Sequence, residues 1–275
     1  MKYLIIIILI FTPLVTHGAL VDNLQGCWEL DEASGTRADS SDNGNTLADN
    51  NTVGQGAAIV AGNSADYERD NNEWLDIADA SQTGLDITSD MSFSGWYNSE
   101  SETNQQELAS KFRSDGNTNK SWLARGDWSS NSLSFYNSSS GVGEVGSGLS
   151  VTLNTATAYH IVMVYDASAG STEVFVDNSS IGTISSLATS MYNSSAPFAI
   201  GKSQPGESGG QVFDGLIDVF AIWDKTLTTD EISDLYASGS GIDCDTITTP
   251  AAAEGSGIFM LMHSVRAITE PFNLI

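Results

Sequence analysis

Val212-Phe-Asp-Gly-Leu-Ile-Asp-Val-Phe-Ala-Ile-Trp223 is the stretch that decides the fold, because it places Asp218 inside an otherwise apolar strand. An ionised carboxylate in a buried strand is costly unless a cation or several N–H donors contact it. The rest of the stretch is apolar and of strand length, which is typical of a buried strand. We therefore expect a fold with buried β-strands.

A single short helix is expected directly after this strand, over residues 229–236. Thr228 and Glu231 have the spacing of a capping box. Gly239 is expected at the left-handed C-cap. The apolar stripe of this helix is expected to pack on the edge of a β-sandwich.

The rest of the chain consists of apolar or alternating runs of strand length, separated by turns rich in Asn, Asp, Ser and Gly. Such a pattern predicts an all-β fold, with two antiparallel sheets packed as a sandwich. Residues 160–166 and 171–176 are expected to form a hairpin. The expected strands are 26–30, 57–59, 74–77, 91–97, 107–112, 121–125, 132–136, 160–166, 171–176, 180–184, 198–200 and 212–223.

The two ends of the chain differ from this middle part. Residues 1–18 have the charged start, apolar run and small residues before the cut that are typical of a cleaved secretory signal peptide. An uncleaved anchor is the alternative, but the run is shorter than the ~20 residues of a membrane span. We expect a domain over 22–245, a weakly ordered tail over 246–275, and a protein that is secreted or at the cell surface, with no membrane span after cleavage.

The chain is strongly acidic, with a formal net charge of −25. Residues 20–245 contain 8 basic and 33 acidic residues, so the acidity belongs to the expected domain. A surface of this charge repels nucleic acid and anionic lipid, and neither is expected as a partner. The charge suits a calcium-containing exterior, although the solubility of a secreted protein explains it equally well.

Cys27 and Cys244 lie near the two ends of the expected domain and are the only cysteines. Export permits a disulfide between them. The chain-entropy model gives about 5 kcal/mol for closing so long a loop, as an upper value. Two free thiols are the alternative.

Several motifs occur in an order that is typical of one family. They are Cys27-Trp-Glu-Leu-Asp-Glu-Ala-Ser-Gly-Thr36, Met91-Ser-Phe-Ser-Gly-Trp-Tyr97, Glu173-Val-Phe-Val-Asp177, Phe198-Ala-Ile-Gly201 and the segment 213–236. Their order resembles the LamG-like (laminin G, concanavalin A-like) jelly-roll domains of secreted bacterial, environmental and phage-encoded proteins. The resemblance covers residues 22–245 and implies that the first and last strands are neighbours in one sheet. It does not decide function, because this fold hosts lectins, adhesins and enzymes.

The resemblance also implies a calcium ion at the rim, held by an acid of the last strand and by oxygens of the early loop. Asp39, Asn45 and Asp218 are the predicted ligands, with Glu32 next. Calcium requires six to eight oxygen ligands, and its role here would be structural or a bridge to sugar hydroxyls. The alternative is that Asp214 and Asp218 only accept backbone N–H bonds at a bulge.

Paired carboxylates give no sign of an enzyme. Glycan-cleaving enzymes of this fold resemble one another in a Glu-x-Asp-x-Glu strand, whose acids share one face. Here Glu29-Leu-Asp31 is followed by Ala33, and Glu173 and Asp177 are four residues apart. No catalytic residue is predicted and the chain is not expected to be an enzyme; a diverged glycan-active enzyme is the remaining alternative.

Four aromatic residues lie in or beside polar loops, where exposed rings stack on sugars: Trp74, Trp122, Trp128 and Tyr136. Trp128 is expected to be the most exposed, and the alternative is that each ring seals the core or its rim. The leading hypothesis is a secreted, non-catalytic module that binds a glycan or another cell-surface ligand and is stabilised by calcium. An adhesion or virion structural protein without a sugar site is the alternative.

Overall fold

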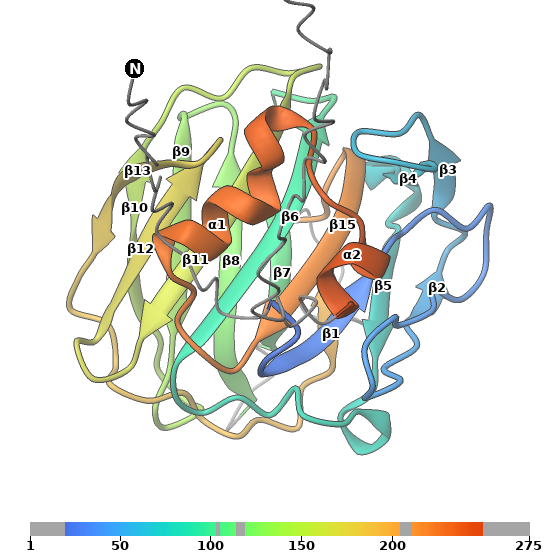
Figure 1. Ribbon diagram of the computed structural model, residues 1–275. Coiled ribbons are helices and arrows are strands. Elements are labelled where there is room, and N and C mark those ends of the chain that lie inside the picture. Colours follow the sequence, from blue (N-terminus) through green and yellow to red (C-terminus); the bar gives the residue numbers. More distant parts are fainter. Residues whose placement is uncertain (1–19, 103–104, 114–118, 204–210, 250–275) are drawn as a thin grey trace, which may run out of the picture.

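The computed structural model describes residues 20–102, 105–113, 119–203 and 211–249, and places their strands in two antiparallel sheets (Figure 1). The first sheet contains β1 (Leu24–Trp28), β3 (Gly54–Gly56), β4 (Ser64–Tyr67), β6 (Met91–Ser99), β11 (Ala158–Asp166), β12 (Ser171–Val176), β13 (Ser179–Ile184) and β15 (Gly215–Trp223). The second contains β2 (Ala48–Asn50), β5 (Trp74–Ile77), β7 (Gln105–Phe112), β8 (Lys120–Asp127), β9 (Ser132–Asn137), β10 (Val145–Ser150) and β14 (Phe198–Ile200).

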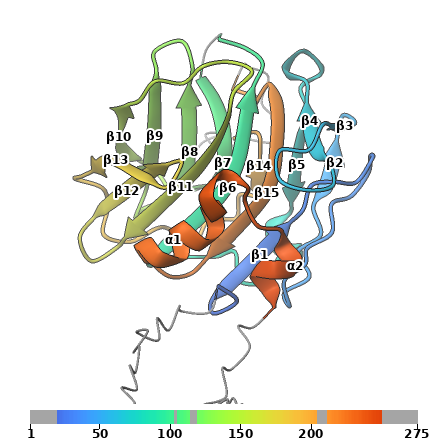
Figure 2. The same cartoon turned by 45° about the horizontal axis from the view of Figure 1, so that its top comes forward.

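The eight-stranded sheet has the order β13-β12-β11-β6-β15-β4-β3, with β1 also paired to β15. The seven-stranded sheet has the order β10-β9-β8-β7-β14-β5-β2. The two sheets pack face to face (Figure 2). The predicted all-β sandwich of two antiparallel sheets is confirmed, as is the hairpin of β11 and β12.

The closing strand β15 lies inside the eight-stranded sheet. It pairs with β6 on one side and with β4 and β1 on the other, so Trp28 lies opposite Phe220. The prediction that the first and last strands are neighbours is confirmed. The register of β15 against β6 shifts between Asp218 and Ala221, where Val219 has a φ of 42°. The acid of the closing strand therefore sits at a β-bulge.

Aromatic rings from both sheets form a continuous row in the core between them. The ring centroids are 5.4 Å apart for Trp28–Phe198, 6.0 Å for Phe198–Phe220, 5.6 Å for Phe220–Phe93, 6.1 Å for Phe93–Trp122, 6.3 Å for Trp122–Phe135 and 5.9 Å for Phe135–Tyr165. Pairs at such separations add about 0.5–1.5 kcal/mol each beyond the buried area. This row holds the two sheets in one relative position.

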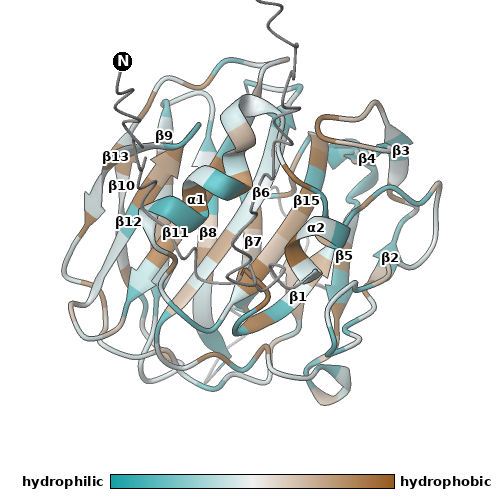
Figure 3. Ribbon diagram, viewed as in Figure 1, coloured by the Kyte–Doolittle hydropathy of each residue, from teal (hydrophilic) through white to brown (hydrophobic). Residues whose placement is uncertain are grey.

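The outer face of the eight-stranded sheet is covered by α1 (Thr229–Tyr236) and α2 (Cys244–Thr248) (Figures 1 and 2). Ile232 and Leu235 of α1 belong to a second buried cluster with Val162 and Trp223 of the sheet. Figure 3 shows α1 hydrophilic on its outward side, above hydrophobic strands. The prediction that the stripe packs on the sandwich edge is wrong, because β11 and β15 present apolar side chains on the sheet face.

The predicted helix boundaries are confirmed, and so is the capping box of Thr228 and Glu231. The predicted C-cap is wrong. Ala237, with a φ of 46°, is the left-handed residue that ends α1, and Gly239 lies two residues further on. The N–H of Ala237 donates to the carbonyl of Ser233, which satisfies a free carbonyl of the last turn.

Cys27 and Cys244 form the predicted disulfide, with Cα atoms 5.8 Å apart and a sequence separation of 217. The bond joins β1 to α2 on the outer face of the eight-stranded sheet. Because Ile247 in α2 is buried, the ordered chain continues past Asp245, where we expected the domain to end. The predicted signal peptide and residues 250–275 of the predicted tail lie outside the described residues. None of the described helices is long and apolar enough to cross a membrane.

Candidate ligand-binding face

Asp218 is fully buried and is held by the backbone of a distant loop. Its Oδ2 accepts the N–H groups of Ile59 and Val60, each at 2.8 Å, while Oδ1 has no hydrogen-bond partner. Burial raises the pKa of Asp218 to about 6, against the lowering effect of these N–H groups. Its contacts are those of the alternative named from the sequence, a carboxylate that accepts N–H bonds at a bulge.

Glu29 is a second acid with a raised pKa, and it lies where α2 meets β1. Its Oε1 accepts the N–H of Cys244 at 2.6 Å. Burial raises the pKa of Glu29 to about 7, and the charges of Asp243 and Asp31 act in the same direction. Asp31 also raises the pKa of Asp218. The junction of β1, β15 and α2 therefore contains several acids at short range.

The early loop uses its polar groups to bind itself. The Asp39 carboxylate accepts hydrogen bonds from the N–H groups of Cys27 (2.9 Å), Ser41 (2.8 Å) and Asn45 (2.7 Å), and from the Ser41 hydroxyl (2.8 Å). The Oδ1 of Asn45 accepts the N–H of Thr83 at 2.7 Å. These contacts fix the loop against β1 and against the turn before β6, and they occupy the oxygens that a cation would need.

The structure brings together two of the four predicted calcium ligands. Asp39 and Asn45 are hydrogen-bonded to each other, whereas Asp218 contacts a different loop. Glu32 binds the N–H of Ala38, and its other oxygen lies 3.7 Å from the Arg37 guanidinium. In the part of the chain that the structure describes, no group of three or more His, Cys, Asp or Glu is placed to hold a metal ion. The donors present fit a hydrogen-bonded loop better than a calcium site.

Trp122 and Trp128 do not lie on the surface, so their predicted exposure is wrong. Trp122 is 1% exposed and stacks between Phe93 and Phe135, and Trp128 is 2% exposed and packs 5.8 Å from Phe213. Trp122 occupies an inward position of β8, and Trp128 continues the inner face past the end of that strand. Neither ring is available to stack on a ligand. Both rings seal the core instead, which is the alternative named from the sequence.

Trp74 and Tyr136 lie instead on the outer side of the seven-stranded sheet. Both are partly exposed, and the residues next to them in sequence, Leu75 and Phe135, point into the core. Because side chains alternate along a strand, Trp74 and Tyr136 point outward. Of the four aromatic residues named from the sequence, Trp74 and Tyr136 are therefore placed where a ligand can reach them, and Trp122 and Trp128 are not.

Polar groups hold Trp74 in one orientation. Its Nε1 donates to Asp76 at 3.0 Å, and Asp76 also accepts from Asn50 at 3.0 Å. The Lys202 ammonium lies 4.1 Å from the centre of the Trp74 ring and donates to Asn72 at 2.6 Å. A cation over an indole face is attracted by its quadrupole. Trp74 is thus a ring fixed by polar groups on several sides.

A second polar group lies across the sheet, around Arg125. Its guanidinium donates to Glu107 at 2.7 and 3.1 Å and lies 5.8 Å from the centre of the Tyr136 ring. Burial raises the pKa of Glu107, while Arg125 and Ser203 lower it. Ser203 donates to the same Glu107 oxygen at 3.0 Å. Lys202, which lies over Trp74, directly precedes Ser203, which contacts Glu107. The polar residues around Trp74 and those around Arg125 therefore form one continuous band.

We call this outer surface of the seven-stranded sheet the open face; its defining residues are Trp74, Asp76, Glu107, Arg125, Tyr136 and Lys202. In the described chain no helix covers it, whereas α1 and α2 cover the other sheet. Sequence reasoning missed Glu107, Arg125 and Lys202. The sequence did contain a signal for Arg125. The whole chain has only ten Lys and Arg residues, so a cation at an outward position of a strand points to a functional surface.

Ser94 and His160 form a buried pair that resembles part of a catalytic dyad. The Ser94 hydroxyl lies 2.7 Å from Nε2 of His160, and the imidazole packs against the rings of Trp96 and Tyr236. Burial lowers the pKa of His160 to about 3, so the ring is neutral at ordinary pH. Because both side chains are buried beneath α1, this pair is inaccessible to a substrate and serves the packing of the helix.

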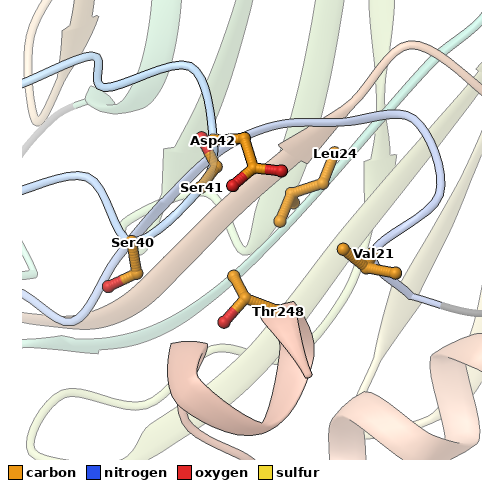
Figure 4. Close-up of a pocket in the computed structure, with 6 residues that line it drawn as sticks. All are labelled: Val21, Leu24, Ser40, Ser41, Asp42 and Thr248. Carbon is orange, nitrogen blue, oxygen red and sulfur yellow. The ribbon is translucent and has the colours of Figure 1, made fainter. Parts of the chain in front are cut away.

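A cavity of about 60 Å³ lies between the loop after β1 and the end of α2 (Figure 4). Its six lining residues are Val21, Leu24, Ser40, Ser41, Asp42 and Thr248. Sites that enclose small molecules measure ~300–1,000 Å³. This cavity is large enough for water and too small for a sugar.

Comparison by sequence gives one match to a family. Residues 69–233, more than half of the chain, match the concanavalin A-like lectin/glucanases superfamily. No curated protein sequence matches the chain.

Comparison by structure finds the same sandwich in distant proteins. Domain 4 of an extracellular arabinanase from Geobacillus stearothermophilus, solved with arabinotriose, has a TM-score of 0.57 and 16% identity, over 77% of this chain and 97% of that one. A botulinum neurotoxin type C structure, whose cell entry depends on two ganglioside molecules, has a TM-score of 0.59 and 14% identity, over 80% and 52%. A carbohydrate-binding domain of a Ruminococcus gnavus sialidase, bound to sialyllactose, has 0.50 and 13%, over 61% and 93%. At these identities the likeness shows the fold alone.

Proposed function

The chain belongs to the concanavalin A-like lectin/glucanase superfamily, and we propose that it is a secreted, non-catalytic module that binds a glycan or another cell-surface ligand on its open face. Two distant structures of this fold are described as bound to arabinotriose or sialyllactose, and a third belongs to a toxin whose cell entry depends on two ganglioside molecules. These structures support a binding role for this chain. The class of ligand must be inferred from the residues of this chain itself.

The observation that carries the proposal is the ring of Trp74, partly exposed and held by Asp76 and Lys202 on a sheet face without a covering helix. Sugar rings bind to such a surface by packing their apolar side on the indole, while hydroxyls bond to neighbouring polar groups. Tyr136 and Arg125 supply a second ring and a second cation across the sheet. Ala199 and Ser110 are paired between β14 and β7 on the same side of the sheet, and both are fully buried.

The net charge of the protein narrows the range of ligands that it can bind. At −25 the protein repels polyanions, so sulfated or uronate-rich glycans are disfavoured as partners. The two cations of the band are engaged with Glu107, Trp74 and Asn72, so they are not free to neutralise the charge of an anionic ligand. We expect neutral glycans to bind best.

A glycan array that covers neutral, sialylated and sulfated glycans tests the proposal. The expected result is binding to one class of neutral glycans, with little dependence on salt because charge is not the main attraction. Absence of binding to every glycan favours the alternative, an adhesion or virion structural protein without a sugar site. Release of reducing sugar from any bound glycan would overturn the non-catalytic assignment.

The calcium ion that the sequence predicts would be structural and would lie outside the open face. If it binds as the sequence predicts, calcium raises the melting temperature of the parent protein, and Asp218→Asn abolishes this rise. Thermal unfolding with added calcium or with a chelator measures both, and Asp224→Asn, at an exposed acid, is the control. An equal response of Asp218→Asn and the parent excludes Asp218 as a ligand.

A further inference from the structure

Two long segments of this acidic chain are almost free of charge. Residues 128–165 contain one charged residue, Glu144, and residues 178–201 contain none. Glu144 is itself paired with Lys120. His160, the histidine of the first segment, is buried and neutral. Of the 35 acidic residues of the chain, only Glu144 lies in these two segments.

The fold brings parts of both segments to the same end of the sandwich. The segments contain β9, β10 and β14 of one sheet and β13 and most of β11 of the other. Figures 1 and 2 show β10 and β13 next to each other at the end opposite β2 and β3. Leu149 of β10 lies against Gly182 of β13, although no hydrogen bonds pair the two strands. This charge-free end is thus one continuous surface.

The edge of this surface is the strand β10. It pairs only with β9, in a register without a bulge, and five of its six residues are exposed. Gly146 and Gly148 are among them, so the exposed surface there is backbone. Edge strands are ordinarily protected by charges, Pro, bulges or short length. Of the other strands that end a sheet here, β2 and β3 have three residues and β13 has a register shift against β12.

Exposed apolar side chains are found at the same place. In the described chain, the two large hydrophobic residues that are exposed are Val142 (54%) and Val145 (44%), directly before and at the start of β10. Apolar groups gathered on an otherwise polar surface mark an interaction site. An unprotected backbone edge and exposed apolar groups therefore coincide, and the one charged residue beside them, Glu144, is paired with Lys120.

We propose that a second copy of this chain docks on β10, with the two β10 strands antiparallel, so that the seven-stranded sheets join into one. The charge distribution identifies the occupant. Two molecules of charge −25 repel each other in most orientations, and the charge-free end is the surface on which this repulsion is smallest. Selection against charge at this end is what self-association of so acidic a protein requires.

The geometry of such a dimer is closed. Antiparallel pairing of two identical edges has a two-fold axis, so the interface is the same on both copies and does not propagate into a fibre. With this axis perpendicular to the joined sheet, both open faces lie on one side. The dimer does not depend on the ligand proposed above, but it would present two binding faces to one surface and increase avidity.

Sedimentation equilibrium of the full chain tests the proposal, with Ser147→Asp compared against the matched neutral change Ser147→Asn. Ser147 is exposed in the middle of β10. The parent and Ser147→Asn are expected to sediment as dimers. Ser147→Asp places two like charges near the two-fold axis and is expected to raise the dissociation constant by at least about tenfold.

Hydrogen exchange supplies a second measurement that does not depend on a variant. The amides of β10 in the parent are expected to become more protected as protein concentration rises, while those of β2 and β3 stay unchanged. A parent that is monomeric at all concentrations would overturn the proposal. So would a dimer that Ser147→Asp leaves as strong as Ser147→Asn, because the interface would then lie elsewhere.

Discussion

Replacing both cysteines of the Cys27–Cys244 disulfide by alanine is expected to lower the free energy of unfolding by about 4 kcal/mol. The bond closes a loop between residues 217 apart, and a cross-link over so long a loop removes much entropy from the unfolded chain. It also ties α2 to β1, beside the contact between Glu29 and the Cys244 N–H. Denaturant titration of the parent and the double variant, with and without reductant, measures the loss.

The double variant leaves no free thiol, so a difference between variant and parent in the absence of reductant reports the bond itself. Reductant is expected to bring the parent down to the stability of the variant and to leave the variant unchanged. A loss below about 1 kcal/mol would mean that packing of α2, rather than the cross-link, secures the two ends of the domain.

Glu29→Gln combined with Asp218→Asn is expected to gain stability over the parent as the pH rises from 4.5 to 7.5, by about 2 kcal/mol. Burial raises the pKa of Glu29 to about 7 and that of Asp218 to about 6. A carboxyl whose pKa is raised in the folded state holds its proton more tightly there than in the unfolded chain. Its contribution to stability is complete below the unfolded pKa and is lost as the pH rises through the folded value.

The comparison must be made against the parent at each pH, because His160 contributes in the opposite direction. Burial lowers its pKa to about 3, so the folded state loses stability as the pH falls below the ordinary histidine value. Denaturant titrations of the parent and the double variant across this pH range isolate the contribution of the two acids to the free energy of unfolding. Asp166→Asn is the control: hydrogen bonds from Ala169 and Ser168 lower the pKa of Asp166, so its effect falls below this range. If the difference in unfolding free energy between the double variant and the parent does not change with pH, then burial raises the pKa of neither acid.

Much of the fold could be predicted from residue pattern because the sandwich buries continuous apolar faces. Residues 160–166 and 171–176 predicted the hairpin of β11 and β12, and Thr228 with Glu231 predicted the start of α1. β10 was not predicted, since its Gly and Ser residues have low strand propensity and the strand exists only by pairing with β9. Residues 57–59 were predicted as a strand from their apolar character. They form instead the loop whose N–H groups reach Asp218.

The candidate site was harder to predict than the fold. Trp122 and Trp128 stand beside polar residues in sequence, which suggested exposure, but the inward alternation with Ala124 decides the position of Trp122. The partners of Trp74 come from segments far apart: Lys202 follows β14, more than a hundred residues further along. No local pattern contains such a pair. The closing strand showed that Asp218 needs partners, and only the folded chain shows that two backbone N–H groups supply them.

Ligand affinity of Trp74→Ala, measured by titration calorimetry with the neutral glycan that gives the strongest array signal, tests the proposed open face most directly. The ring is expected to contribute enough contact that its removal weakens binding by at least about tenfold. Tyr236→Ala is the matched control, because Tyr236 is also a partly exposed ring but lies on α1, over the opposite sheet. The account predicts that Trp74→Ala loses affinity and Tyr236→Ala keeps it. Undiminished binding by Trp74→Ala, or loss of binding only in Tyr236→Ala, would contradict it.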